Sequence, residues 1–122
     1  MEIIIKTVGA VLLTDEVRSF TEDKVRKLEK LLDPGDTGIM AEIELSSVSQ
    51  SRSGDLFRAE INLTFAGGFI RAAASRENLH AAIDQAVAEA KREVKKVRTK
   101  HRDLVRRGAA RVKDFFQRFR GQ

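Results

Sequence analysis

The chain has 122 residues, one proline and 42% hydrophobic residues, so it can form one compact core and is too short for two ordinary domains. It contains no cysteine, which excludes disulfides, thiolate nucleophiles and cysteine-ligated metals. No segment approaches the roughly 20 apolar residues that span a bilayer, and Met1–Thr7 lacks the features of a secretory signal, so we expect a cytoplasmic protein.

Positive charge is concentrated at the C-terminal end of the chain. The net charge is +5, but residues 89–122 hold 13 Lys and Arg against 4 Asp and Glu, a net charge of +9, and residues 1–88 carry −4. A basic segment on such a body attracts polyanions, nucleic acid first and an anionic membrane surface second. The alternative is a solvated helix face that its charges keep soluble.

The first third of the chain predicts a strand and a helix. A β-branched run with Ile3 and Ile5 predicts a strand that ends near Val8–Gly9. Thr14 is a suitable N-cap, and the two acidic residues after it favour the positive end of a helix dipole. The turn sequence Asp33–Asp36, with its proline and glycine, should end this helix. Its apolar stripe comprises Val17, Phe20, Val25, Leu28, Leu31 and Leu32.

From Gly38 onward the hydrophobic period changes to two. This alternation predicts strands over residues 39–46 and 57–65, each with one buried face. The polar stretch Ser46–Asp55 is expected to be a flexible hairpin connection. Gly67 and Gly68 then turn the chain into a fourth strand around Phe69–Ala74, so the last three strands should form a meander.

A second helix follows, for which Ser75 or Asn78 is the expected N-cap. The element order β-α-β-β-β-α predicts an α+β two-layer sandwich, in which a four-stranded sheet carries two helices on one face and a C-terminal helical extension follows. We expect a domain over residues 1–103 and a basic amphipathic helical tail over residues 104–122. An unbroken helix to the end would overhang the body, so we expect a kink or break at Gly108, because glycine is unfavourable inside helices.

The sequence contains no catalytic or metal-binding pattern. His80 and His101 lie 21 residues apart, without the carboxylates of a metal site or a catalytic triad. Gly67 and Gly68 fit a hairpin turn and lack the lysine and hydroxyl residue of a phosphate loop. We therefore predict that the protein is not an enzyme and needs no cofactor, metal or small-molecule substrate.

Basic residues lie beside the apolar stripes of both helices. Such surfaces bind phosphates whatever the base sequence, and the lack of Trp and Tyr favours recognition of RNA shape and backbone over base stacking. For Lys24 alone, the alternative is a stem along the core edge with an exposed ammonium group. The strip on the first helix comprises Lys24, Lys27 and Lys30. One flank of the second helix carries Arg92, Lys96 and Lys100, and the other carries Lys91, Lys95, Arg98 and Arg102.

Leu13–Arg18 with Lys24–Leu31, and Ala74–Asp84 with the basic helix after it, resemble segments of the ribosome hibernation promoting factor and ribosome-associated inhibitor family, short form. The resemblance covers about residues 2–103. It implies a domain that binds the small ribosomal subunit over the channel for messenger and transfer RNA, blocks initiation and protects idle ribosomes. The residues implied to face ribosomal RNA are Lys24, Lys27, Lys30, Arg92, Lys96 and Lys100.

The tail departs from the resemblance, because it is basic and too short for a dimerisation domain. Its apolar positions, Val112, Phe115, Phe116 and Phe119, are expected to contact a partner, such as a second copy, or to fold back onto the domain. A disordered end that orders on the ribosome is the alternative. The alternative functions are a general double-stranded RNA-binding module and a membrane or protein-interaction module that acts through the tail.

Overall fold

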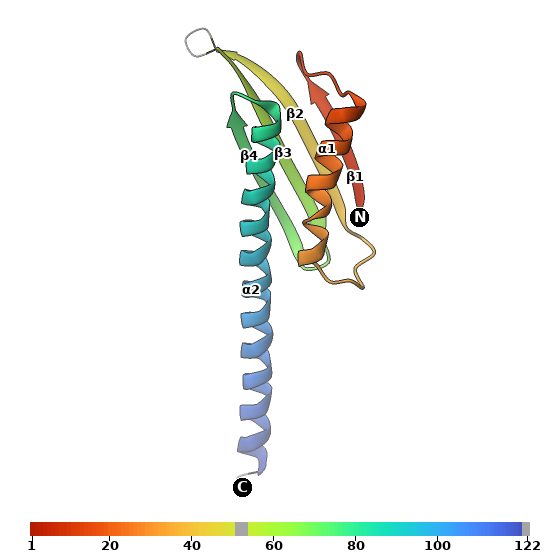
Figure 1. The fold of residues 1–122 in the computed structure, drawn as a ribbon. Coiled ribbons are helices and arrows are strands. Elements are labelled where there is room, and N and C mark those ends of the chain that lie inside the picture. Colours follow the sequence, from red (N-terminus) through yellow and green to blue (C-terminus); the bar gives the residue numbers. More distant parts are fainter. Residues whose placement is uncertain (51–53, 121–122) are drawn as a thin grey trace.

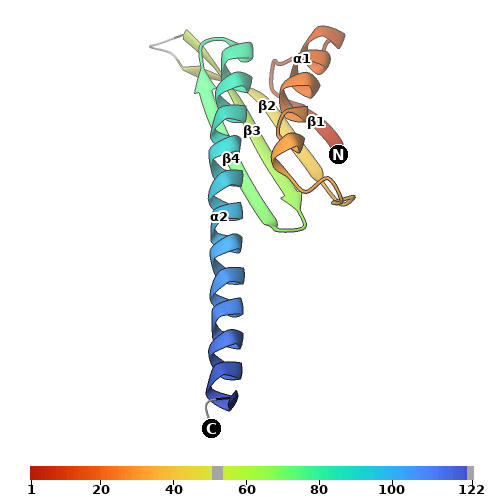
Figure 2. The same cartoon turned by 60° about the horizontal axis from the view of Figure 1, so that its bottom comes forward.

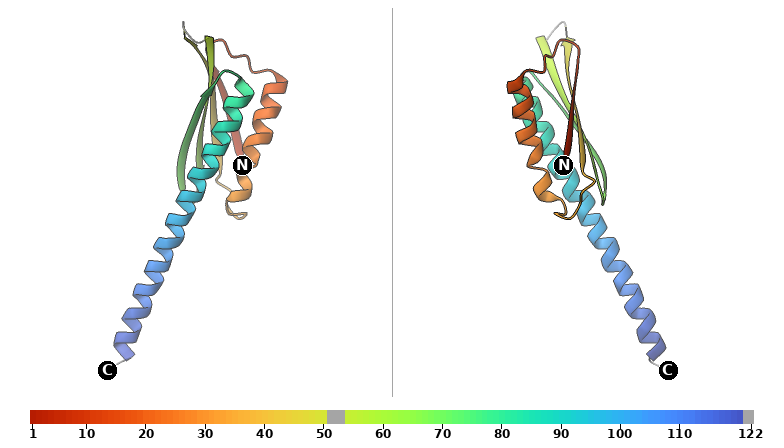
Figure 3. Two further views of the ribbon diagram at one scale, coloured as in Figure 1. Left: turned by 60° about the vertical axis from the view of Figure 1, so that its left-hand side comes forward. Right: turned by 90° about the vertical axis from the view of Figure 1, so that its right-hand side faces the viewer.

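The structure, a computed structural model, describes the backbone of residues 1–50 and 54–120, with the side chains of residues 1–47, 56–100 and 102–108. One four-stranded sheet carries both helices on the same face (Figures 1 and 3). The predicted α+β two-layer fold is therefore confirmed. Its elements are β1 (Glu2–Val8), α1 (Asp15–Arg26), the 3-10 turn η1 (Glu29–Leu31), β2 (Met40–Gln50), β3 (Gly54–Phe65), β4 (Gly68–Arg76) and α2 (Leu79–Arg120).

The strands lie in the order β1-β2-β3-β4. β1 pairs with β2 in parallel, and β2, β3 and β4 form the predicted antiparallel meander. α2 packs against β4 and β3, and α1 lies over the β1 side of the sheet (Figure 1). Because both helices cover one face, no helix of the described residues lies over the opposite face of the sheet (Figure 3).

α1 begins as predicted and ends earlier. The Thr14 hydroxyl oxygen accepts a hydrogen bond from the Val17 N–H at 3.2 Å, which confirms the N-cap. The helix was expected to reach Leu32, but after Arg26 the chain tightens into i→i+3 hydrogen bonds, such as Leu28 N–H to Val25 carbonyl at 2.9 Å. A spacing of three matches the 3-10 geometry and keeps the apolar side chains of this segment in the core.

The β2–β3 hairpin is longer than the sequence predicts. Ser46–Asp55 was expected to be a flexible connection, but the ladder continues from Ser46 opposite Arg58 to Gln50 opposite Gly54. Main-chain groups make these pairs, so polar side chains do not prevent them. The pattern failed here because hydrophobic alternation marks a strand only where one of its faces is buried.

The core lies between the sheet and the two helices. Leu45, Ile61 and Leu63 of the sheet are almost completely buried, as are Leu28 and Ile83 on the helical side. The stripe of α2 contains Ala82, Ala86 and Ala90, all fully buried, and these small side chains let the helix lie close to the sheet.

α2 starts as predicted and does not break. The Asn78 side-chain oxygen accepts the His80 N–H at 2.8 Å, so Asn78 is the N-cap. The helix is 42 residues long and continues through Gly108, and its ribbon runs to its end without a sharp bend (Figure 1), so the expected kink or break is wrong. One glycine costs about 1 kcal/mol relative to alanine, which does not interrupt a helix flanked by strong helix formers. None of the helices in the described residues is long and apolar enough to cross a membrane.

Candidate nucleic-acid interface

Four contacts fix which side of α2 faces α1 and η1. His80 Nε2 lies 2.9 Å from Glu16 Oε1, and the His80 ring meets the Phe20 ring edge-on with centroids 4.4 Å apart. Lys24 Nζ lies 3.1 Å from Asp84 Oδ1. Further along, the Arg98 guanidinium donates to the carbonyl of Leu31.

These contacts show which basic residues of α2 lie on the side that faces α1. Positions 91 and 95 fall on the same side of the helix as 84 and 98, and position 102 lies one turn beyond 98. We call Lys91, Lys95, Arg98 and Arg102 the α1-side flank. Lys91 is half-buried and the other three are exposed.

The three lysines at positions 24, 27 and 30 differ in their surroundings. Lys27 and Lys30 are both exposed. Lys30 directly precedes Leu31, whose carbonyl accepts the hydrogen bond from Arg98. Lys24 is 31% exposed and lies between the Asp84 carboxylate and the Phe20 ring, whose centroid is 5.4 Å from Nζ. Its stem is therefore partly covered and its charge is paired, which matches the structural alternative for this residue.

The other basic flank of α2 lies away from α1. A hydrogen bond from Arg76 to Gln85 turns that side of the helix toward β4. On it, Arg92 pairs with Glu89 at 3.0 Å and Lys96 pairs with Glu93 at 3.3 Å, while both basic side chains remain more than 70% exposed. We call Arg92, Lys96 and Lys100 the β4-side flank. All three are exposed, as expected.

The structure places the predicted lysines on the side of the α1-side flank, away from the β4-side flank with which the family resemblance groups them. Lys27, Lys30 and the α1-side flank line the seam between the helices, whereas the β4-side flank lies on the opposite side of α2. The family resemblance implies the β4-side flank as the one that acts with these lysines, whereas periodicity alone could not decide which flank lies beside them, because both border the same apolar stripe. The contacts that decide it join residues 60 to 67 positions apart, and no local pattern marks them.

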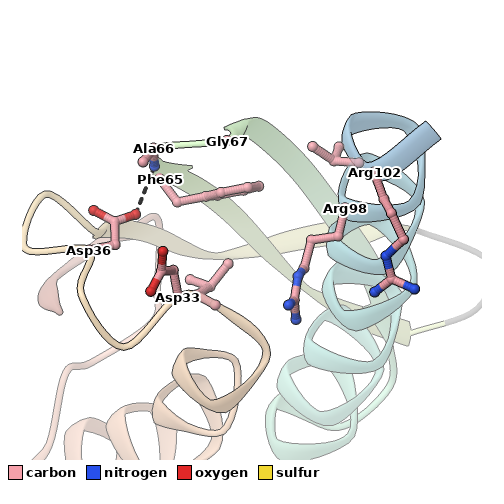
Figure 4. Close-up of a pocket in the computed structure, with 9 residues that line it drawn as sticks. Asp33, Asp36, Phe65, Ala66, Gly67, Arg98 and Arg102 are labelled. Carbon is pink, nitrogen blue, oxygen red and sulfur yellow. Dashed lines mark hydrogen bonds between the residues drawn. The ribbon is translucent and has the colours of Figure 1, made fainter. Parts of the chain in front are cut away.

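A hollow of about 360 Å³ opens where α2 leaves the sheet (Figure 4). Asp33 and Asp36 lie on one side of it, and Arg98 and Arg102 lie on the other. Asp36 accepts the Gly38 N–H at 2.9 Å and the Ala66 N–H at 2.7 Å, and Asp33 accepts the Gly35 N–H at 2.9 Å.

These hydrogen bonds show that the acidic side of the hollow connects two turns of the backbone, since Asp36 binds N–H groups of both. The backbone N–H groups of Ala66 and Gly38 lower the pKa of Asp36, because they stabilise its charged form. Three of the four carboxylate oxygens in the hollow accept backbone hydrogen bonds. Within the described residues, no group of three or more His, Asp or Glu side chains could hold a metal ion. The arginine side of the hollow continues the α1-side flank.

The open face of the sheet contrasts with the helical face. Here Glu60 lies within 3.5 Å of both Arg58 and Arg71, so these positive charges are paired. Glu2, Glu42 and Glu44 belong to strand positions of the same face. A polyanion therefore meets fewer unpaired positive charges on this face than on the helical face.

Comparison with known proteins identifies a matching family and similar solved structures. Residues 3–102 match the family described as sigma 54 modulation protein / S30EA ribosomal protein. The chain is similar to the Protein Y N-terminal domain of Thermus thermophilus, with 30% identity and a TM-score of 0.65, over 79% of this chain and 98% of that one. A ribosomal subunit interface protein from Coxiella burnetii shares the fold, with 16% identity and a TM-score of 0.64, over 81% and 99% of the two chains. Among curated proteins, none matches the chain.

The family match and the structural similarity cover the same part of the chain. The match ends at residue 102, close to the point where α2 stops packing against the sheet near Val97. The Thermus thermophilus domain is covered almost completely, so the shared part is the sheet with its two helices. The chain belongs to the sigma 54 modulation protein / S30EA ribosomal protein family.

Proposed function

We propose that this protein is a ribosome hibernation factor that inhibits translation. It binds the small ribosomal subunit over the channel for messenger and transfer RNA, blocks initiation and protects idle ribosomes. The observation that carries the proposal is the seam between the helices, where Lys27, Lys30 and the α1-side flank gather on the helical face of a member of this family.

Charge and exposure support contact with ribosomal RNA. The seam holds basic side chains from both sides, and among the described contacts none of them is paired with a carboxylate, whereas the neighbouring Lys24 is paired with Asp84. Each phosphate that such a side chain neutralises releases condensed counterions, so binding should weaken steeply as salt rises. The bulky two-layer domain also suits recognition of a folded RNA surface, because base stacking would need exposed aromatic residues along the helices.

The inhibitory mechanism in this proposal is occupation. A domain bound over the channel excludes messenger RNA and transfer RNA by volume, and no bond is made or broken. The β4-side flank supplies a second row of phosphate contacts, since Arg92 and Lys96 remain mostly exposed although each has an acidic neighbour. The names of the two solved relatives, a Protein Y domain and a ribosomal subunit interface protein, agree with this assignment.

Sedimentation with small ribosomal subunits tests the proposal. The wild type should sediment with the subunits at low salt and inhibit a cell-free translation system. The double variant Lys27→Glu, Lys95→Glu should lose both properties. The matched control is Lys6→Glu, Arg71→Glu, which reverses two charges on the open face of the sheet.

Three outcomes would contradict the proposal. A wild type that stays at the top of the gradient at low salt and leaves translation unchanged is not a hibernation factor. Competition by excess RNA duplex that removes the protein from small subunits would instead favour a general double-stranded RNA-binding module. Equal loss in the seam variant and the control would move the interface away from the helical face.

A further inference from the structure

The end of α2 projects beyond the sheet and α1 (Figures 1 and 2). Val97 is the last residue of the helix that packs against the core, and the helix continues to Arg120 (Figures 1 and 2). We call residues 103–120 the arm. At 1.5 Å per residue it is about 27 Å long. It begins where the family match ends, so the shared domain does not account for it.

The arm is basic and its described part is exposed. Residues 103–120 contain 6 Lys and Arg against 2 Asp, a net charge of +4. Arg106 and Arg107 are exposed, and so are Leu104 and Val105, at 63% and 58%. Among the described side chains of the arm, none makes a hydrogen bond or an ion pair with the domain.

The positive charge of the arm continues that of the domain. Positions 98, 102 and 106 follow one another at four-residue spacing, so the α1-side flank runs without a gap from the seam into the arm. Positions 113 and 120 follow 106 at intervals of seven residues, which is two helical turns, and so remain on the same side of the backbone helix.

We propose that the arm is a second RNA-binding element, which carries the protein's contact with RNA beyond the area under the domain. This inference rests on the proposed function and extends it to a part of the chain outside the family match. The arm binds phosphates about 27 Å further along the RNA surface than the domain reaches. RNA is the favoured occupant because the flank that faces it on the domain continues along the arm. A second copy would bring two arms of the same charge together.

The test separates charge from apolar character in the full-length protein. The charge variant is Arg106→Gln, Arg107→Gln, Arg111→Gln, Lys113→Gln, which keeps good helix formers. The apolar control is Leu104→Gln, Val105→Gln, which keeps every charge. Binding to small ribosomal subunits is measured over a range of salt concentrations, together with hydroxyl-radical footprinting of the ribosomal RNA.

The charge variant should bind about tenfold or more weakly, and its salt slope should fall by about three for four lost contacts. It should keep the footprint of the domain and lose protection outside it, while the apolar control keeps both. Unchanged affinity and footprint in the charge variant would overturn the inference. So would loss of binding in the apolar control, dimerisation of the free protein, or flotation with acidic vesicles that depends on Leu104 and Val105.

Protein-free ribosomal RNA distinguishes failure of this inference from failure of the proposed function. If the wild type does not bind subunits but binds the free RNA with a salt slope that the charge variant lowers, the hibernation role is wrong and the arm contact holds. If both proteins bind the free RNA with equal slopes, the arm contact is wrong, whatever the subunit experiment gives.

Discussion

Asp36 joins two turns that are distant in the sequence, because its carboxylate accepts the N–H groups of Gly38 and Ala66. Replacing Asp36 by Asn removes one of the two acceptor oxygens and the charge, so Asp36→Asn should lower the melting temperature at neutral pH. Thermal melts of the variant and the wild type measure this. Asp23→Asn, at an exposed position of α1, is the control and should melt with the wild type.

The same residue predicts a pH dependence. The pKa of Asp36 is lowered in the folded protein from an ordinary value of 3.8, so its stabilising contribution is fully present above that value. The contribution is lost as the pH falls below 3.8 and through the folded pKa. The difference between the melting temperatures of the wild type and Asp36→Asn should therefore shrink in that range. A difference that stays constant down to the acid unfolding of the wild type would contradict this account.

Lys24 and Lys27 differ in environment, although the sequence places both on one basic strip. Lys24→Met keeps the covered stem and removes a charge that Asp84 already pairs, so subunit binding should change by less than about threefold. Lys27→Met removes an exposed charge and should weaken binding more, with a lower salt slope. Binding titrations at several salt concentrations measure both. A larger loss for Lys24→Met would mean that Lys24 leaves Asp84 to contact RNA.

At the scale of elements, sequence patterns located every helix and strand where a buried face produced a period. They predicted the N-cap Thr14 and offered Ser75 or Asn78 for α2, of which the structure uses Asn78, because a cap is a local interaction. They failed at the hairpin end, where the polar residues from Ser46 onward still pair through the backbone. They also failed at Gly108, because the helix propensity of one glycine, about 1 kcal/mol less favourable than that of alanine, is too small to interrupt a long helix.

The two flanks of α2 should differ in their effect on binding. Lys91→Glu, Lys95→Glu, Arg102→Glu changes the flank beside Lys27 and Lys30, and should reduce subunit binding more than Arg92→Glu, Lys96→Glu, Lys100→Glu. Both variants should keep the fold, since changes at exposed positions usually move stability by about half a kcal/mol. Sedimentation with subunits and circular dichroism measure the two properties. Unchanged binding in the second variant would remove the β4-side flank from the interface, and a larger loss there would reverse the order proposed here.

Gly108 and Gly68 predict opposite responses to alanine. At Gly108 a methyl group meets no atom within 4 Å apart from the backbone of its own helix, so Gly108→Ala should stabilise the arm locally by about 1 kcal/mol and slow its amide exchange. Global unfolding should hardly change, because the described part of the arm is exposed. At Gly68, φ is +153° and a Cβ would lie 3.2 Å from Val97 Cγ1, so Gly68→Ala should lower the melting temperature. Faster exchange in the arm of Gly108→Ala would show that the glycine serves a bend.

At the scale of the whole molecule, the sequence predicted the layers and left the lateral arrangement of the helices open. Periodicity gives each helix one buried stripe, and two such helices must share one face of the sheet. Which flank of α2 faces α1 depends on pairs such as Lys24 with Asp84 and Arg98 with the Leu31 carbonyl. The resemblance therefore groups the lysines at positions 24, 27 and 30 with the β4-side flank, and only the three-dimensional contacts show that this part of the chain lies beside the α1-side flank. The predicted tail contacts, Val112, Phe115, Phe116 and Phe119, lie outside the described side chains.

Removal of the arm tests whether the stability of the domain depends on the arm. The buried residues of α2 end at Val94, with Val97 at the margin, so a chain that ends after Arg102 keeps the whole described core. Its melting temperature and its urea m-value should equal those of the full chain, because little apolar surface buried in the domain is lost. Its helical signal in circular dichroism should fall by the share of the residues removed.

A clear drop in melting temperature on truncation would show that the arm stabilises the domain in solution, either by folding back or by packing against a second copy. Light scattering of the full chain at high concentration separates these two cases, since only the second raises the mass. If the truncated and full chains unfold alike and both are monomers, the arm stands free until it meets a partner. Its basic residues are then available to RNA without first breaking contacts in the protein, which is the condition that a second RNA-binding element requires.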